Sequence, residues 1–462
     1  DDEGNEVELS NGNYIKFLHS LNRDVRKGAW MAVYNAHIAL KNTLTSTLAG
    51  QIKADIFMQK ARRFNSCVER SLFEDDIDVS VYNSLIEAVH IKLPVFHKYL
   101  AIRQKVLNLD SLDMYDMYVP LVSNFDFKVT FEEARDIVLE SLAPLGSEYV
   151  SIAKRGLTSV EEGGEAWADV FENQGKRSNC VSVQSYKLQP YMLLNFDGTL
   201  DSVFTLAHEL GHSMHTYYSS HNQPHHTGIW RYITTEVPST MNEALLNEYL
   251  MNKAKKEQNK KFELYLINKK CESFKGTLIR QTQFAEFERD VHQLAERGQA
   301  LTPDSVSGLY KRINDEYYGD NNTDEGKRKK YPHNLQSSPL IAWEFARIPH
   351  FYYQYALAIS VSDVLASRIL EGKPADSLDR FFNFIKAGDS KSPLDIIADA
   401  GVDVRQPQPF INALDHFEIL IQDLERLLKE VDDLDKHNQD ENNDKQDQEE
   451  VNVKKKEKKK KD

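Results

Sequence analysis

Apolar and polar residues alternate along most of this chain with the period of an α-helix, so the pattern predicts a mostly α-helical protein. Residues 12–155 read as successive amphipathic helices, with few helix breakers between 24 and 60. The sequence Thr130-Phe-Glu-Glu is a capping box, which predicts that a helix begins at this point.

Two further helices are predicted after residue 300. The first covers residues 302–318, where Thr302 is suited to cap the helix, Pro303 to occupy its first turn and Gly319 to end it. The second is an amphipathic helix over residues 408–434. A basic, polar loop is expected at 320–334.

The only convincing β signal lies between residues 158 and 200, where several glycines interrupt the chain. Residues 180–186 alternate in polarity as a strand does, and residues 191–194 are the expected partner strand. We therefore expect a small β element inside a helical protein.

These elements divide the chain into three parts. We expect an N-terminal helical lobe at residues 1–155, a catalytic domain at 156–435 and a charged tail at 436–462. The tail is almost entirely Asn, Gln, Asp, Glu and Lys and ends in KKKEKKKKD. Because it cannot bury apolar surface, we expect it to be disordered.

Composition narrows the classes of function. The net charge of −14 argues against non-specific nucleic-acid binding as the main role. No run of 18 apolar residues predicts a membrane span, and the start DDEGNEVELS is too acidic and polar for a secretory signal peptide. Cys67, Cys180 and Cys271 are widely spaced, so we expect buried free thiols, a reducing compartment and a cytoplasmic location.

The sequence His208-Glu209-Leu-Gly-His212 carries the clearest chemical signal. Its two histidines are one turn apart on one face of a helix, so both imidazoles can bind the same ion. Glu209 is placed to reach a water bound to that ion and to take its proton. The surrounding apolar residues predict a buried helix, with Asp201 as its cap. We therefore expect a catalytic zinc site.

A third ligand is required. The longer pattern HExxHxxGxxH is excluded, because His215 stands at its glycine position and Tyr218 at its last histidine position. A glutamate on a following helix is the remaining option, and Glu236 and Glu243 lie seven residues apart on one helix face. One could bind zinc while the other orients a ligand histidine, and spacing alone does not choose between them.

At these residues the chain resembles the oligoendopeptidase F branch of the thimet-oligopeptidase-like zinc metallopeptidases. The resemblance extends over roughly residues 15–425 and is more specific than HExxH alone. It rests on HELGHSMH at 208–215, TEVPSTMNEALL at 235–246, DVFENQGKRS at 169–178, QFAEFERDVH at 283–292 and RIPHFYY at 347–353.

The resemblance implies that Glu236 is the third zinc ligand and that Glu243 supports the site from behind. It also implies a two-lobed helical fold with a deep channel, one zinc ion on the channel floor and the small β element beside it. Members of the family cleave short, unstructured peptides, and the strand region near Gly175 would pair with the substrate backbone. The N-terminal lobe is shorter than is usual in the family, which favours a truncated lobe.

The family also uses a histidine and tyrosines opposite the zinc to stabilise the oxyanion. By resemblance His350 is that histidine, and Tyr352, Tyr353 and Tyr355 are the candidate tyrosines. The aromatic stretch between them is shorter than in the family. Loss of one oxyanion donor typically lowers turnover by about 100- to 1,000-fold.

The leading hypothesis is therefore a zinc endopeptidase with Glu209 as general base. Short peptides are its expected partners, with neither nucleic acid nor membrane, and a monomer is expected. The shortened tyrosine segment motivates an alternative, a zinc-bearing peptide-binding protein with weak or lost activity. A thermolysin-like peptidase would use Glu243 as ligand, but Asn247 stands where that pattern has an aspartate.

Overall fold

The computed structural model describes residues 1–10, 13–122, 127–319 and 350–458, with side chains up to residue 434. It confirms a mostly α-helical fold with one small sheet. The elements before the sheet are α1 (Tyr14–Leu18), α2 (Arg23–Ala39), α3 (Lys41–Ala61), α4 (Cys67–Phe73), α5 (Val79–Val106), η1 (Met114–Met117), α6 (Phe131–Ser141), η2 (Ala143–Leu145) and α7 (Ser147–Leu157).

The helices after the sheet carry the predicted site. They are α8 (Leu200–Asn222), α9 (Tyr232–Lys256), α10 (Lys260–Ser273), η3 (Phe274–Ile279), α11 (Arg280–Glu296), α12 (Pro303–Tyr318), α14 (Tyr353–Glu371), α15 (Ser377–Lys386), α16 (Pro393–Asp399) and α17 (Gln408–Lys458). The η3 segment is π-helical and joins α10 to α11. Among the described residues, no helix has the length and apolar character that crossing a membrane requires.

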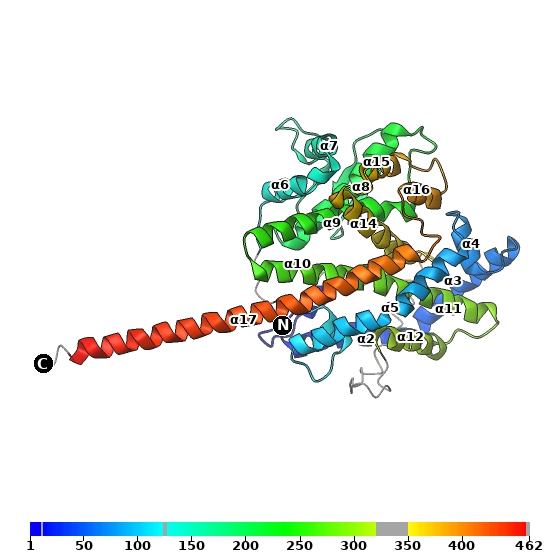
Figure 1. Cartoon of the computed structure of the whole chain (residues 1–462). Helices are drawn as coiled ribbons and strands as arrows, with labels where there is room; N and C mark the ends of the chain where they lie inside the picture. Colours follow the sequence, from blue (N-terminus) through cyan, green and yellow to red (C-terminus); the bar gives the residue numbers. More distant parts are fainter. Residues whose placement is uncertain (11–12, 123–126, 320–349, 459–462) are drawn as a thin grey trace.

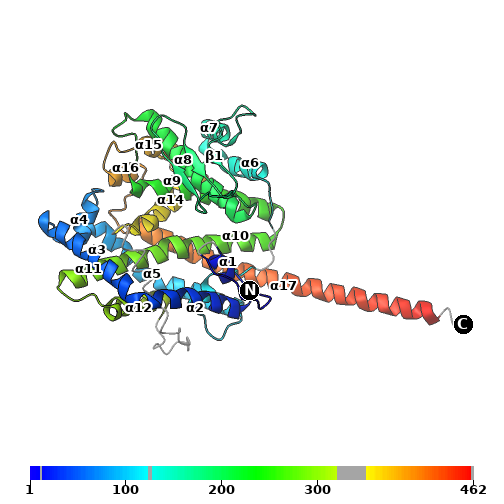
Figure 2. The same ribbon diagram turned by 180° about the vertical axis from the view of Figure 1, so that it is seen from behind.

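The helices are arranged in levels around a shared apolar core. In Figure 1, α6 to α9 and α14 to α16 lie in the upper part, α10 and α17 cross the middle, and α2, α5 and α12 lie at the bottom. Figure 2 shows the same order from behind. Helix α9 packs against α8, α10 and α14, while α17 packs against α5, α10 and α14. The assignment of residues 1–155 and 156–435 to separate parts remains a prediction.

The sheet has the strand order β1-β3-β2. Strand β2 (Val181–Val183) pairs antiparallel with β3 (Tyr191–Leu193), as the sequence predicted, with Ser182 opposite Met192. Strand β1 (Ala168–Asp169) pairs parallel with β3 and was not foreseen. A two-residue strand is too short to produce an alternating pattern, so only its tertiary pairing reveals it.

Local capping signals predicted several helix ends correctly. The capping box predicted at Thr130 forms, Thr302 caps α12 as predicted, and Gly319 ends α12 with φ of +91°. Thr302 also forms a capping box with Ser305. Helix α8, however, begins two residues earlier than expected. Its cap is Thr199, whose hydroxyl accepts a hydrogen bond from the Ser202 backbone at 3.3 Å, and Asp201 lies in the first turn.

The stretch 24–60 forms two successive helices, α2 and α3, which are separated at Leu40. The tail at 436–462 was expected to be disordered, but α17 continues as a helix to Lys458 and extends away from the body (Figure 1). No Gly or Pro follows Pro409, so nothing in the backbone interrupts that helix. The loop expected at 320–334 lies outside the described residues.

Helices α8 and α9 pack closely against each other at Gly211. A Cβ atom at this position would lie 2.5 Å from the Pro238 carbonyl oxygen and 2.5 Å from the Ser239 Cα. Both are backbone atoms, so they cannot turn aside as a side chain would. The helices can pack at this distance only because residue 211 has no side chain.

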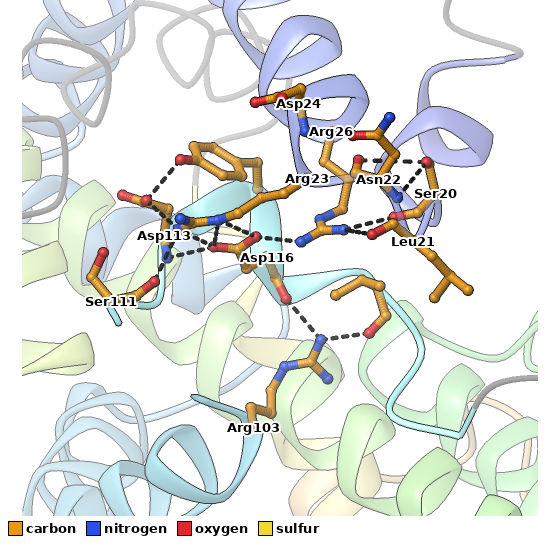
Figure 3. Close-up of polar contacts among 12 residues, drawn as sticks. Ser20, Leu21, Asn22, Arg23, Asp24, Arg26, Arg103, Ser111, Asp113 and Asp116 are labelled. Atoms are coloured by element: carbon orange, nitrogen blue, oxygen red, sulfur yellow. Dashed lines mark hydrogen bonds and ion pairs between the residues drawn. The ribbon is translucent and has the colours of Figure 1, made fainter. Parts of the chain in front are cut away.

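A buried ion-pair network joins α2 to η1 and α5. Figure 3 shows Arg23 and Arg26 converging on Asp116, whose side chain is fully buried. The Arg26 guanidinium lies 2.7 Å from the Asp116 carboxylate and is itself only 3% exposed. Arg103 of α5 donates to the backbone carbonyls of Asp116 and Val119 at 2.8 and 2.7 Å. Arg26 and Asp116 are both removed from water, so each charge is compensated mainly by the other.

Removing Asp116 should destabilise the fold. We expect Asp116→Ala to lower the free energy of unfolding by about 3–5 kcal/mol, because Arg26 would remain buried without a counter-charge. Urea denaturation measures this change. Asp110→Ala, at an exposed position of the same connection, is the control and should change stability by less than about 0.5 kcal/mol. Equal stability of the two variants would contradict the prediction.

The helix crossing gives a second prediction. Gly211→Ala should lower the free energy of unfolding by about 1–3 kcal/mol, because the new methyl group forces α8 away from α9. Gly308→Ala in α12 is the matched control, since a Cβ there meets no atom within 4 Å. That control should be neutral or stabilising by up to about 1 kcal/mol. The idea fails if both variants unfold at the same urea concentration.

Candidate metal centre

The crossing of α8 and α9 brings together three possible metal ligands. His208 and His212 project from adjacent turns of α8, and Glu236 projects from α9. The two Nε2 atoms are 3.2 Å apart, and Glu236 Oε2 lies 3.4 Å from His208 Nε2 and 3.5 Å from His212 Nε2. Among the described residues, this is the only group of His, Cys, Asp and Glu side chains close enough to hold an ion.

These distances fit a zinc ion. Zinc bonds nitrogen and oxygen ligands at about 2.0–2.2 Å, so tetrahedral ligand atoms lie about 3.3–3.6 Å apart. The two histidines and the carboxylate form a triangle of this size, which leaves a fourth position open for water or substrate. Two imidazole nitrogens this close need a cation or a shared proton between their lone pairs. The donor set and its geometry therefore suit one zinc ion.

A second layer of hydrogen bonds holds each ligand in this orientation. Glu243 Oε1 lies 2.6 Å from His208 Nδ1, and Thr235 Oγ1 lies 3.3 Å from His212 Nδ1. The Ser239 hydroxyl donates to Glu236 Oε2 at 3.0 Å. Since both Nδ1 atoms are engaged, both Nε2 atoms face the centre. Glu243 contacts the far side of His208, which does not favour the thermolysin-like alternative with Glu243 as ligand.

Glu209 lies beside the triangle, and its carboxylate is buried. The residue is 6% exposed, and its Oε2 atom has no hydrogen-bond partner among the described residues. Burial raises the pKa of Glu209 to about 7, the nearby His208 lowers it, and the charge of Glu236 raises it again. A carboxylate with a raised pKa and a free oxygen is suited to accept a proton.

The three residues and Glu209 line a cleft of about 700 Å³. Strand β2 forms one wall, α8 and α9 the floor, and η3, α11 and α14 contribute to the rest. The cleft is lined by Cys180, Val181, Ser182, Val183, Gln184, His208, Glu209, His212, Trp230, Tyr232, Thr235, Glu236, Thr240, Glu243, Ser273, Thr277, Gln281, Phe351 and Tyr355. The three cysteines are free; Cys67 and Cys271 are buried as expected, but Cys180 is only half-buried because it lies on this wall.

Strand β2 presents an open edge beside the metal centre. It is the last strand of the sheet, and β3 is its only partner among the described residues. The Ser182 hydroxyl lies 2.8 Å from the Ser213 hydroxyl, which connects β2 to α8. Val181 and Val183 are exposed. The edge can therefore accept an extended peptide by backbone hydrogen bonds.

The residues expected to stabilise an oxyanion do not come together. Tyr355 lines the cleft, where burial, then the charges of Glu236 and Tyr232, raise its pKa to about 12. Tyr353 is buried, and its hydroxyl has no hydrogen-bond partner among the residues that the structure describes. Tyr352 packs on Phe284 with ring centroids 5.6 Å apart. Tyr353 and Tyr355 are both in α14, and side chains two residues apart on a helix point to different sides.

His350 also lies away from the cleft. It is 3% exposed, its ring centroid is 4.6 Å from that of His292, and both ring nitrogens lack partners among the described residues. Its backbone N–H donates to Glu288 Oε1 at 2.9 Å. Burial, and then the neighbouring His292, hold the pKa of His350 well below its usual range. Of the four predicted donors, the structure brings only Tyr355 to the metal centre.

Several cleft residues were missed by sequence reasoning. Tyr232 is 65% exposed at the start of α9 and lies 5.7 Å from Phe351 between ring centroids. Thr277 and Gln281 reach the cleft from η3 and α11. Tyr232 lies four residues before Glu236 in the same helix, so its position in the sequence could have indicated that it lies near the site. The other two carry no motif, and only the folding of η3 against α14 brings them there.

Comparisons with known proteins identify the family of this chain. The model of peptidase family M3 matches residues 16–416. Oligopeptidase PepF of Bacillus subtilis is 42% identical over 437 residues, which cover 93% of this chain and 62% of PepF. Group B oligopeptidase PepB of Streptococcus agalactiae is 38% identical, covering 92% of this chain and 68% of PepB.

A solved structure shows the same fold. The crystal structure of oligoendopeptidase F from Enterococcus faecium superimposes with a TM-score of 0.70 at 32% identity, covering 93% of this chain and 68% of that one. This chain thus spans about two thirds of the length of these relatives. The expected resemblance to the oligoendopeptidase F branch is confirmed, and the chain belongs to peptidase family M3.

Proposed function

We propose that this chain is a zinc-dependent endopeptidase that hydrolyses short, unstructured peptides. The observation that supports it most is the triangle of His208 Nε2, His212 Nε2 and Glu236 Oε2, with sides of 3.2–3.5 Å. Beside it lies Glu209, whose Oε2 atom has no hydrogen-bond partner within the described parts of the chain. The proposal includes a single zinc ion, peptides as the partners, a monomer and a cytoplasmic location.

Each side chain has a defined task in the proposed reaction. Zinc, when bound by His208, His212 and Glu236, activates a water molecule and polarises the scissile carbonyl. Glu209 accepts a proton from the attacking water and then passes it to the leaving amine. Glu243 and Thr235 keep the two imidazoles in the required orientation from behind.

The substrate would lie along the edge of β2 as an additional strand. Backbone hydrogen bonds of this kind are independent of side chains and require an extended peptide, so a folded protein would not be accepted. The Tyr355 hydroxyl, protonated at neutral pH because its pKa is raised to about 12, would donate to the developing oxyanion.

A second candidate function rests on the same cleft. His350, Tyr352 and Tyr353 do not line it, so three of the four expected oxyanion donors are missing from the cleft. A chain of this kind could bind zinc and peptides but turn over slowly, as a peptide-binding protein. Peptide binding at full zinc occupancy, without cleavage by the wild-type chain, would favour this function.

The role of Glu209 can be tested directly. Glu209→Gln should lower kcat for a quenched-fluorescence peptide by about 100- to 10,000-fold, because the general base is lost. Zinc content, measured by atomic spectroscopy, should stay at that of the wild type, because residue 209 is not a ligand. Glu257→Gln, at the exposed end of α9, is the control and should cleave normally. Undiminished cleavage by Glu209→Gln would rule out this mechanism.

The role of Tyr355 gives a separate prediction. Tyr355→Phe should lower kcat by about 100- to 1,000-fold with little change in KM, because a donor to the oxyanion acts mainly in the transition state. Tyr353→Phe is the matched control: the Tyr353 hydroxyl is buried and does not line the cleft, so its loss should leave kcat unchanged. Steady-state kinetics distinguish the two variants. Equal kcat values would exclude Tyr355 as the donor.

A further inference from the structure

A second cavity of about 340 Å³ lies directly beside the metal cleft. The two hollows have Thr240, Glu243 and Ser273 in common. We name the second one the α9 side pocket. It is lined by Phe204, Thr240, Glu243, Ala244, Asn247, Lys269, Lys270, Glu272, Ser273, Phe274, Ile359, Ser362 and Asp363.

The position of this pocket along α9 relates it to the scissile bond. Thr240, Ala244 and Asn247 follow the proposed ligand Glu236 on one face of the helix. At 1.5 Å per residue they lie roughly 6–16 Å from Glu236 along the helix axis. An extended peptide advances about 3.3 Å per residue. A substrate in the cleft would therefore pass the pocket with a residue about two to five positions from the bond that is cut.

The walls of the pocket provide apolar surface. Phe204, Phe274 and Ile359 are buried large side chains, and Ala244 is a small residue on the α9 side. The volume is at the low end of the range of about 300–1,000 Å³ for ligand pockets. It therefore suits one large side chain rather than a whole small molecule.

The acidic residues of the wall all have partners. Glu243 is bound to His208 at 2.6 Å, and Glu272 to Arg103 at 2.6 Å and to Lys275. Asp363 lies 2.7 Å from His416 Nδ1. Each of these carboxylates already accepts a hydrogen bond or an ion pair from a neighbouring side chain, so a basic side chain would have to compete with those partners.

The two lysines of the wall are also paired. Lys270 lies 3.5 Å from Asp363, and Lys269 forms an ion pair with Asp201 while its ammonium lies 4.5 Å from the centre of the Phe204 ring. An acidic side chain would have to break one of these pairs. A neutral side chain enters without disturbing any of them.

We propose that the α9 side pocket binds a large, neutral, apolar side chain of the peptide substrate, two to five residues from the scissile bond. The pocket then sets the sequence preference of the enzyme, while the metal centre performs the reaction. This inference rests on the proposed peptidase function.

The test is a set of quenched-fluorescence peptides that differ at one position. Phe, Ala, Lys or Glu is placed in turn at each position from two to five residues on either side of the cut bond. At one position the Phe peptide should have a kcat/KM about 10- to 100-fold above the Ala peptide, because a large side chain is buried there. The Lys and Glu peptides should not exceed the Ala peptide.

A variant that fills the pocket completes the test. Ala244→Trp should abolish the preference, so that the ratio of kcat/KM for the Phe peptide to kcat/KM for the Ala peptide falls to about 1. Ala54→Trp, at an exposed position of α3, is the matched control and should retain the preference. Ala244→Leu fills less space and should reduce the preference in part, which guards against a folding defect in the larger variant.

Failure of this inference is distinguishable from failure of the proposed function. If Glu209→Gln and the wild type both leave every peptide intact, the peptidase function is wrong. The dissociation constants of the same peptides, measured by fluorescence polarisation with Glu209→Gln, then test the pocket without turnover. If the peptides are cut or bound with no preference for Phe at any position, or if Ala244→Trp keeps that preference, the α9 side pocket is not a specificity site.

Discussion

The close crossing of α8 and α9 at Gly211 is the constraint on which the metal centre depends. Gly211 lies between His208 and His212 in α8, and the α9 residues that it touches follow Glu236 by only two or three positions. A side chain at 211 would separate the helices and enlarge the triangle of ligand atoms. The glycine of the HELGH segment therefore acts on the metal site through the packing distance between two backbones.

Side chains around the triangle of ligand atoms also hold these ligands in place. Glu243 and Thr235 hold the two histidine rings from behind, and Ser239 holds Glu236. The contact between Ser182 and Ser213 connects the edge strand β2 to the same helix that carries the histidines. A peptide paired with β2 would thus be positioned relative to the ligands by one direct connection. Farther along α9, the same face continues into the α9 side pocket, so a single helix relates the reacting bond to a distant subsite.

The opposite wall is built differently. Its residues come from η3, α11 and α14, and η3 is a π-helical segment, a form that is often found at functional sites. Tyr355 faces the metal centre from α14, whereas His350 and Tyr353 are buried among aromatic residues such as Tyr82. This wall therefore carries only one of the four expected oxyanion donors, Tyr355.

The sequence by itself determined whatever depends on residues a few positions apart. Two histidines one turn apart must share a helix face, the caps at Thr130 and Thr302 start helices, and alternating polarity identifies β2 and β3. Only the tertiary structure decided that Glu236, rather than Glu243, has its carboxylate facing both Nε2 atoms, and that Tyr355 alone of four expected donors reaches the cleft. Those outcomes depend on how α9 and α14 are rotated against their neighbours. That rotation is set by packing between segments distant in the chain, and local patterns of residues do not encode it.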